Sequence, residues 1–123
     1  MNDTLTQGRE AEAWARDYLQ KQGLKLITQN YRSRYGEIDL VMQQGQTLVF
    51  VEVKYRGNND YGGAAGAVTR GKQAKLLKTA MTYMQQEKPL LQNMRFDVIA
   101  MQPGISEKFA CEWLQNVIEQ HQG

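Results

Sequence analysis

Cysteine and histidine are almost absent from this chain of 123 residues, which contains one of each, Cys111 and His121. A lone cysteine excludes an internal disulfide and is typical of proteins that work in a reducing compartment. The sequence also lacks the clustered Cys and His residues that hold zinc. Any metal that the chain binds is therefore expected to be a hard cation held by oxygen atoms.

Long apolar runs are missing as well. No stretch approaches the ~20 consecutive apolar residues that span a bilayer, so we expect no membrane association. The first residues, MNDTLTQGREAEAW, contain no basic segment leading into an apolar run, and we expect no signal peptide. With the lone cysteine, these absences predict a cytoplasmic protein. The length and the lack of a linker or repeat predict a single domain over residues 1–123.

Charge of one sign is not in large excess, since the net charge is only +2. The distribution is uneven: residues 31–78 contain eight basic and four acidic residues, so this stretch carries +4 and the remainder −2. A basic region around a few acidic residues suits a polyanionic substrate that needs a metal. An ordinary uneven surface is the alternative interpretation.

What the chain does contain is a strong hairpin signal in residues 36–56, GEIDLVMQQGQTLVFVEVKYR. Two runs of alternating and β-branched residues flank a polar segment with one glycine, which predicts two antiparallel strands joined by a tight turn. With Gln44 and Gly45 as a two-residue loop, the predicted pairs are Gln43 with Gln46, Asp39 with Phe50 and Glu37 with Glu52.

Four charged residues interrupt these apolar strands, namely Glu37, Asp39, Glu52 and Lys54. Residues two apart in a strand share a face, so the predicted pairing brings Asp39, Glu52 and Lys54 together; a loop one residue longer would break this parity. A solvated face with a salt bridge between Glu52 and Lys54 is the alternative. We favour a site, because the second strand is apolar on both faces and buried carboxylates need a partner such as a divalent cation.

Upstream of the hairpin, an amphipathic helix is predicted over residues 8–22, where apolar residues recur at helical spacing from Ala11 and Gly23 follows as a stop. Glu12 lies at the margin of the buried stripe, and a surface role in the first turn explains it when it is taken alone. A strand over residues 24–31 and a basic connection over residues 32–36 then lead into the hairpin.

Downstream, residues 55–66 (YRGNNDYGGAAG) predict a mobile loop. A second helix is predicted from the N-cap Thr69 to Gln86. Its predicted buried stripe comprises Ala74, Leu77, Met81 and Met84, widened by Leu76, Ala80 and Tyr83.

Basic residues line the other side of this helix, mostly in its first half, where they oppose the helix dipole; a nearby phosphate would reverse that effect. They are Arg70, Lys72, Lys75 and Lys78. Gln73 heads the apolar face, and a ligand contact, a capping role and a solvent-facing role all remain open for its amide.

The last third of the chain predicts two more strands. Residues 95–101 are expected to pair in parallel with the second hairpin strand, because the connection between them contains a helix. Asp97 in this strand is expected to be a partner for Arg95 or an exposed end rather than a ligand. Residues 109–113 predict an antiparallel edge strand, and residues 116–120 a last helical turn.

Five segments, GREAEAWARDYLQKQG, GEIDLVM, LVFVEVKYR, AVTRGKQAKL and RFDVIA, resemble the YraN-like family of small bacterial proteins over about residues 8–114. The same residues are similar to the PD-(D/E)XK nuclease superfamily, whose archaeal Holliday junction resolvases are the nearest characterised relatives. The resemblance implies an α/β, restriction endonuclease-like fold: an αβββαβ core with a mixed central β-sheet flanked by helices. Ile38 stands where the superfamily has a proline before its aspartate.

The resemblance also implies a chemistry, namely metal-dependent endonucleolytic hydrolysis of nucleic-acid phosphodiester bonds with Mg²⁺ or Mn²⁺. DNA, branched or junction DNA included, is the expected substrate. Asp39, Glu52 and the carbonyl of Val53 would hold the metal, while Lys54 would orient or deprotonate the attacking water. Glu12 would bind the ion through a water. Candidates for contact with the nucleic acid are Arg32, Arg34, Arg56, Lys72, Gln73 and Lys75.

The alternative function is a nucleic-acid-binding module with the nuclease fold but no turnover, or a scaffold for a DNA repair or DNA uptake complex. The intact set of Asp39, Glu52 and Lys54 favours catalysis, because a binding module has no need of opposed carboxylates. Junction, flap, single-stranded DNA and RNA remain open as substrates, and a homodimer is expected if the substrate is a junction.

Overall fold

A computed structural model of the chain describes residues 3–55 and 69–118, the side chains from residue 8 onward. The elements follow the order α1 (Asp3–Lys21), β1 (Lys25–Ser33), β2 (Gly36–Gln44), β3 (Thr47–Tyr55), α2 (Arg70–Glu87), β4 (Asn93–Pro103) and β5 (Phe109–Leu114). The predicted succession of two helices and five strands is confirmed. Tyr55, the first residue of the loop expected to be mobile, belongs to β3, and the rest of that loop, including Arg56, lies outside the described residues.

The strands form one five-stranded mixed sheet in the order β1-β2-β3-β4-β5. β3 and β4 are parallel, and α2 lies in the connection between them; the other neighbouring pairs are antiparallel. A parallel pair needs such a crossover, whereas antiparallel neighbours can be joined by tight turns. The predicted α/β class, parallel pair and edge strand β5 are confirmed.

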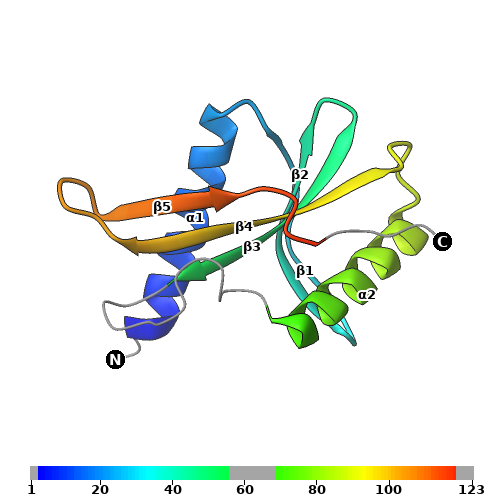
Figure 1. Ribbon diagram of the computed structural model, residues 1–123, viewed down its shortest axis with the longest axis horizontal. Helices are drawn as coiled ribbons and strands as arrows, with labels where there is room; N and C mark the ends of the chain where they lie inside the picture. The colour runs from blue at the N-terminus through cyan, green and yellow to red at the C-terminus, as the bar shows by residue number, and fades with distance from the viewer. Residues whose placement is uncertain (1–2, 56–68, 119–123) are drawn as a thin grey trace.

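The two helices cover opposite faces of the sheet (Figure 1). Because side chains alternate along a strand, Val49 and Val51 of β3 pack towards α1, while Leu48 and Phe50 pack towards α2. All four are at most 2% exposed. Because β3 is buried on both faces, its charged end with Glu52 and Lys54 is held close to the two helices.

The helix boundaries were predicted well, except that α1 begins at Asp3 rather than near residue 8. Gly23 has a φ of 99° and ends α1, with the Leu24 amide donating to the Leu19 carbonyl (3.0 Å). Thr69 is the N-cap of α2, since its hydroxyl accepts a hydrogen bond from the Lys72 amide (3.3 Å).

The predicted buried stripe of α2 was wrong in part. The buried residues are Leu76, Thr79, Ala80 and Tyr83, whereas Met81 is 47% exposed and Ala74 is exposed. The helix is thus rotated towards Thr79, whose hydroxyl donates to the Lys75 carbonyl (2.8 Å) and so is satisfied inside the apolar layer.

The predicted pairing of the hairpin was wrong by two residues. Gln44 pairs with Thr47 and Leu40 with Val51, so the loop is Gly45-Gln46. Gly45 has a φ of 58°, and a type II′ turn places glycine at the first of its two central positions, not the second. Moving a two-residue loop along by one residue shifts every pair by two, so the predicted parity survives.

Two smaller corrections concern connections. β1 continues through Ser33, so the turn before the hairpin is Arg34-Tyr35 rather than residues 32–36. Residues 116–118 are not helical, and Asn116 has a φ of 57°, so the predicted last helical turn is wrong over these residues; residues 119–120 lie outside the described part of the chain.

Asp97 is one of three buried polar residues among those described and is 1% exposed, so the interpretation as an exposed strand end was wrong. Arg95 donates to both of its carboxylate oxygens at 3.0 Å, which confirms the predicted partnership. Trp113 Nε1 and the Asn116 amide also donate to it, each at 2.9 Å. Its bonds are all structural, and they tie the segment after β5 to β4.

Candidate metal centre

Asp39 lies near the start of β2 and is 7% exposed. Its Oδ2 accepts a hydrogen bond from the Val53 amide of β3 (2.7 Å). Continuing the β2–β3 register by one residue beyond Leu40 and Val51 places Asp39 opposite Glu52, and the two carboxyl groups are hydrogen-bonded. The two residues that the sequence brings together are therefore in direct contact, although the predicted pairs set Asp39 opposite Phe50 and Glu37 opposite Glu52.

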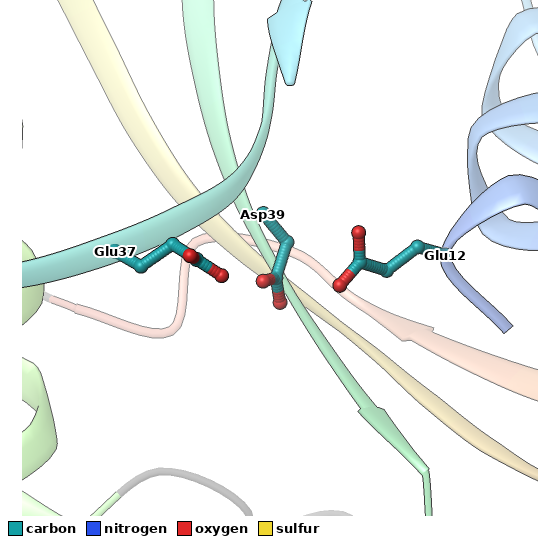
Figure 2. A group of neighbouring side chains, drawn as sticks. All are labelled: Glu12, Glu37 and Asp39. Carbon is teal, nitrogen blue, oxygen red and sulfur yellow. The ribbon is translucent and has the colours of Figure 1, made fainter. Parts of the chain in front are cut away.

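Two further carboxylates join Asp39. Oxygen atoms of Glu12, Glu37 and Asp39 all lie within 4.8 Å of one another. Figure 2 shows Asp39 between the other two, with Glu12 approaching from α1 and Glu37 from its own strand. Sequence reasoning gave Glu37 no metal role. Its position two residues before Asp39 on the same strand is the signal that could have assigned one.

Glu12 reaches the centre because α1 packs closely on the sheet. Ala11 and Ala15, at most 1% exposed, are the contacts of this helix beside Glu12, and small side chains let the helix approach. Glu12 is one residue, or about 100°, away from Ala11, so it lies at the edge of the packed face. Glu12 is therefore not a plain surface glutamate, because its side chain is half-buried and faces other carboxylates.

The backbone around the centre is irregular. The register pairs Gln29 with Leu40 and Tyr31 with Ile38; between them, Asn30 has a left-handed φ of 56°. Ile38 packs on the α2 side while Leu40 packs on the α1 side, so the usual alternation is interrupted at Asp39. The Asn30 side chain is hydrogen-bonded to Glu12. This irregularity explains how Asp39 meets carboxylates from both sides of the sheet.

Crowding of acids in a buried place changes their titration. Burial, the hydrogen bond with Glu52 and the negative charge of Glu52 raise the pKa of Asp39 to about 9, against the opposing effect of the Val53 amide. Burial and repulsion by Glu37 raise the pKa of Glu12. Without a cation, Asp39 therefore carries a proton at neutral pH.

The donor set fits a hard divalent cation. The converging groups are carboxylates, the ligands that Mg²⁺, Mn²⁺ and Ca²⁺ prefer, and a bound cation would replace the proton on Asp39. Val53 contributes its amide to Asp39, and metal binding by its carbonyl remains a prediction. Lys54 follows Glu52 by two residues, is half-buried and has an interaction partner in the structure.

The predicted phosphate-binding residues are distributed unevenly. Lys72 and Lys75 line a hollow of about 200 Å³ that is shared with Glu37 and Glu52. Arg32 Nε lies 2.7 Å from Glu37 Oε2, so its charge is paired.

The others lie outside this hollow. The Arg34 guanidinium is 5.0 Å from the centroid of the Tyr35 ring. Gln73 is half-buried and has an interaction partner, so it is not a purely solvent-facing amide. Its role in binding a ligand remains a prediction.

The fold and the centre define a class: an α/β protein in which two helices cover a five-stranded mixed sheet and carboxylates from α1, β2 and β3 converge. Neither α1 nor α2, the helices among the described residues, has the length and apolar character needed to cross a membrane.

Comparison with known proteins assigns the family. The sequence profile of "Uncharacterised protein family UPF0102" matches residues 11–101. A UPF0102 protein of Methylococcus capsulatus is 50% identical over 112 residues, covering 91% of this chain and 89% of the relative. One of Vibrio campbellii is 46% identical over 115 residues, covering 92% of both chains. One of Aeromonas hydrophila is 47% identical over 113 residues, covering 90% and 83%. The chain belongs to the UPF0102 family, which confirms the YraN-like resemblance.

Proposed function

We propose that this protein is a metal-dependent endonuclease that hydrolyses phosphodiester bonds of nucleic acid, with DNA as the substrate and Mg²⁺ or Mn²⁺ as the cofactor. The observation that carries the proposal is the convergence of Glu12, Glu37, Asp39 and Glu52 beside a hollow lined by Lys72 and Lys75. Crowded carboxylates destabilise the fold unless a cation joins them, and adjacent lysines attract a polyanion.

The resemblance to PD-(D/E)XK nucleases supports the same conclusion. Its aspartate, Asp39, and its E-x-K motif, Glu52-Val53-Lys54, occupy the paired strands β2 and β3, and Glu12 lies on the preceding helix. The element order matches the αβββαβ core that the resemblance implies. We propose the restriction endonuclease-like core on these grounds.

Each residue then has a defined task. A divalent cation, when bound, would polarise a phosphoryl oxygen and lower the pKa of a water. Asp39 and Glu52 would hold it directly, with Glu37 and Glu12 at the margin. As an ammonium, Lys54 would orient the attacking water and offset negative charge that develops on the phosphate; as a neutral amine, it would instead accept the proton of that water at Nζ. Lys72 and Lys75 would hold backbone phosphates, which supply affinity rather than sequence recognition.

A binding module without turnover is the second candidate, and one observation favours it. Asp39 and Glu52 are hydrogen-bonded to each other, so the pair is internally satisfied when Asp39 is protonated. A module of this kind, or a scaffold of a DNA repair or uptake complex, would fold without a cation and would not respond to one.

The test is a panel of labelled junction, flap, single-stranded and duplex DNA incubated with Mn²⁺, with Mg²⁺ or with EDTA. The proposal predicts internal cleavage of at least one substrate that requires the ion and is lost in Asp39→Asn. Asp97→Asn, which alters a buried carboxylate outside the centre, is the matched control and should cleave if it folds. If wild type cleaves nothing while binding DNA equally in Mn²⁺ and EDTA, the binding module is the better account.

For a junction substrate we propose a homodimer, because a two-fold symmetric junction is cut at two symmetric positions and so needs two metal centres. Light scattering with and without junction DNA tests this. A complex with one protein chain per junction would contradict it. The expected cytoplasmic location remains a prediction.

A further inference from the structure

A second hollow of about 260 Å³ lies on the α1 side of the carboxylates. It is lined by Arg9, Glu12, Ala13, Arg16, Gln29 and Asn30. Glu12 belongs both to this hollow and to the carboxylate group, so the hollow borders the candidate metal centre directly. From the sequence, lysines of α2 were predicted to contact the nucleic acid, whereas Arg9 and Arg16 were assigned no role.

The two arginines and Glu12 form one stripe on α1. Arg9 precedes Glu12 by three residues and Arg16 follows it by four, which places all three on the same helix face. Within the described residues, however, neither arginine makes an ion pair with Glu12. The positive charges therefore border the acidic centre without being neutralised by it.

Arg16 is held in place by other groups. Its Nε forms an ion pair with the exposed Asp17 (3.2 Å to Oδ1), and its Nη1 donates to Gln29 Oε1 at 3.4 Å. The side chain is 29% exposed, so it is anchored but still open to a ligand. Arg9 is exposed and has no ion pair among the described residues. The guanidinium of Arg16 is thus anchored, and that of Arg9 is exposed to solvent. A guanidinium matches the geometry of a phosphate better than an ammonium does.

The hollow on the α2 side provides the counterpart. There Lys72 and Lys75 accompany Glu37 and Glu52. The carboxylates thus separate two hollows, each of which carries two cations from a different helix. A polyanion that passes over the carboxylates would meet positive charge on both sides of them.

We propose that Arg9 and Arg16 form a second backbone-phosphate site, so that one nucleic-acid strand lies across the carboxylates between α2 and α1. This inference rests on the proposed nuclease function and deepens it. The strand continues on both sides of the phosphate to be cleaved, as endonucleolytic cleavage requires. The contacts are to phosphates and carry no base preference.

The test measures the salt dependence of DNA binding in EDTA, where cleavage does not interfere. Wild type, Arg9→Ala with Arg16→Ala, and Lys72→Ala with Lys75→Ala are titrated with fluorescent single-stranded and junction DNA over a range of KCl. Each lost phosphate contact should flatten the slope of log K against log salt by about 0.7 to 0.9. Each double variant should therefore lose about one to two units of slope, and the two losses should add in the quadruple variant.

Two controls make the result specific. Lys21→Ala with Lys25→Ala removes the same charge from the last turn of α1, about 13 Å along the axis from Glu12, and from the start of β1, and should keep nearly the wild-type slope. Arg9→Lys with Arg16→Lys keeps the charge and should restore most of the slope. Thermal unfolding of every variant shows whether the fold is retained.

The outcomes separate the two proposals. If wild type binds and cleaves DNA while the arginine variant keeps the wild-type slope, the second phosphate site is wrong and the nuclease stands. If the arginine variant and the Lys21 and Lys25 control lose the same slope, the effect is general charge and the site is again wrong. If wild type neither binds nor cleaves any nucleic acid, both proposals fail together.

Discussion

Asp39 gives the sharpest prediction, because its pKa of about 9 in the folded protein is far above the ordinary value of 3.8. Between these values the folded protein holds a proton that the unfolded chain has released. The free energy of unfolding must therefore fall as pH rises through this window, by up to about 1.4 kcal/mol per pH unit. Below pH 4 both states are protonated and this contribution no longer changes.

The perturbation that isolates this effect is Asp39→Asn. An asparagine keeps the shape, accepts from the Val53 amide through Oδ1 and donates to Glu52 through Nδ2, yet it does not titrate. In EDTA, wild type should lose about 2 to 3 kcal/mol of stability between pH 5 and pH 7 relative to Asp39→Asn. Urea unfolding at several pH values measures both proteins.

Mn²⁺ adds a second readout, because it competes with the proton on Asp39. Its stabilisation of wild type should be larger at pH 8 than at pH 6, and it should be nearly lost in Asp39→Asn. Parallel pH profiles for the two proteins, or equal stabilisation of both by Mn²⁺, would refute the reasoning.

Three further predictions follow. Asp39→Ala should bind DNA in EDTA about as well as wild type, because the protonated Asp39 contributes no negative charge there, while its cleavage in Mg²⁺ falls by orders of magnitude. Lys72→Ala with Lys75→Ala should instead weaken binding to all sequences, and gel shift with a cleavage assay separates the two variants. Glu37→Gln should weaken Mn²⁺ binding in calorimetry but change stability by less than about 1 kcal/mol, since its pair with Arg32 is exposed; unchanged Mn²⁺ affinity would remove Glu37 from the centre. Asp97→Ala should destabilise the fold by about 3 to 5 kcal/mol, because it leaves Arg95 without its buried partner; a loss under 1 kcal/mol in urea unfolding would contradict this.

The sequence correctly predicted that Asp39 and Glu52 lie together, even though the predicted register of the hairpin was wrong. Side chains in a strand alternate with a period of two, and sliding a two-residue loop along the chain changes pairs in steps of two. The actual turn places Gly45 first, so the pairing moved by two residues while the face stayed the same. In such a hairpin, the face of the sheet on which a side chain lies is therefore predicted more securely than its cross-strand partner.

The remaining parts of the centre depend on packing that no local pattern records. Glu12 meets Asp39 because Ala11 and Ala15 let α1 approach the sheet and because Asn30 interrupts the regular ladder. The face of α2 is likewise set by where it docks, which buries Thr79 and leaves Met81 exposed. Spacing identified the residues that could take part, and the tertiary arrangement selected among them.

The central claim is that these carboxylates hold a divalent cation, and anomalous scattering from crystals grown with Mn²⁺ tests it most directly. The account predicts a peak within about 2.0–2.3 Å of oxygen atoms of Asp39 and Glu52, with the hydrogen bond between the two carboxyls broken. A crystal without a peak there, in which Asp39 and Glu52 remain hydrogen-bonded to each other at neutral pH and millimolar Mn²⁺, would contradict it.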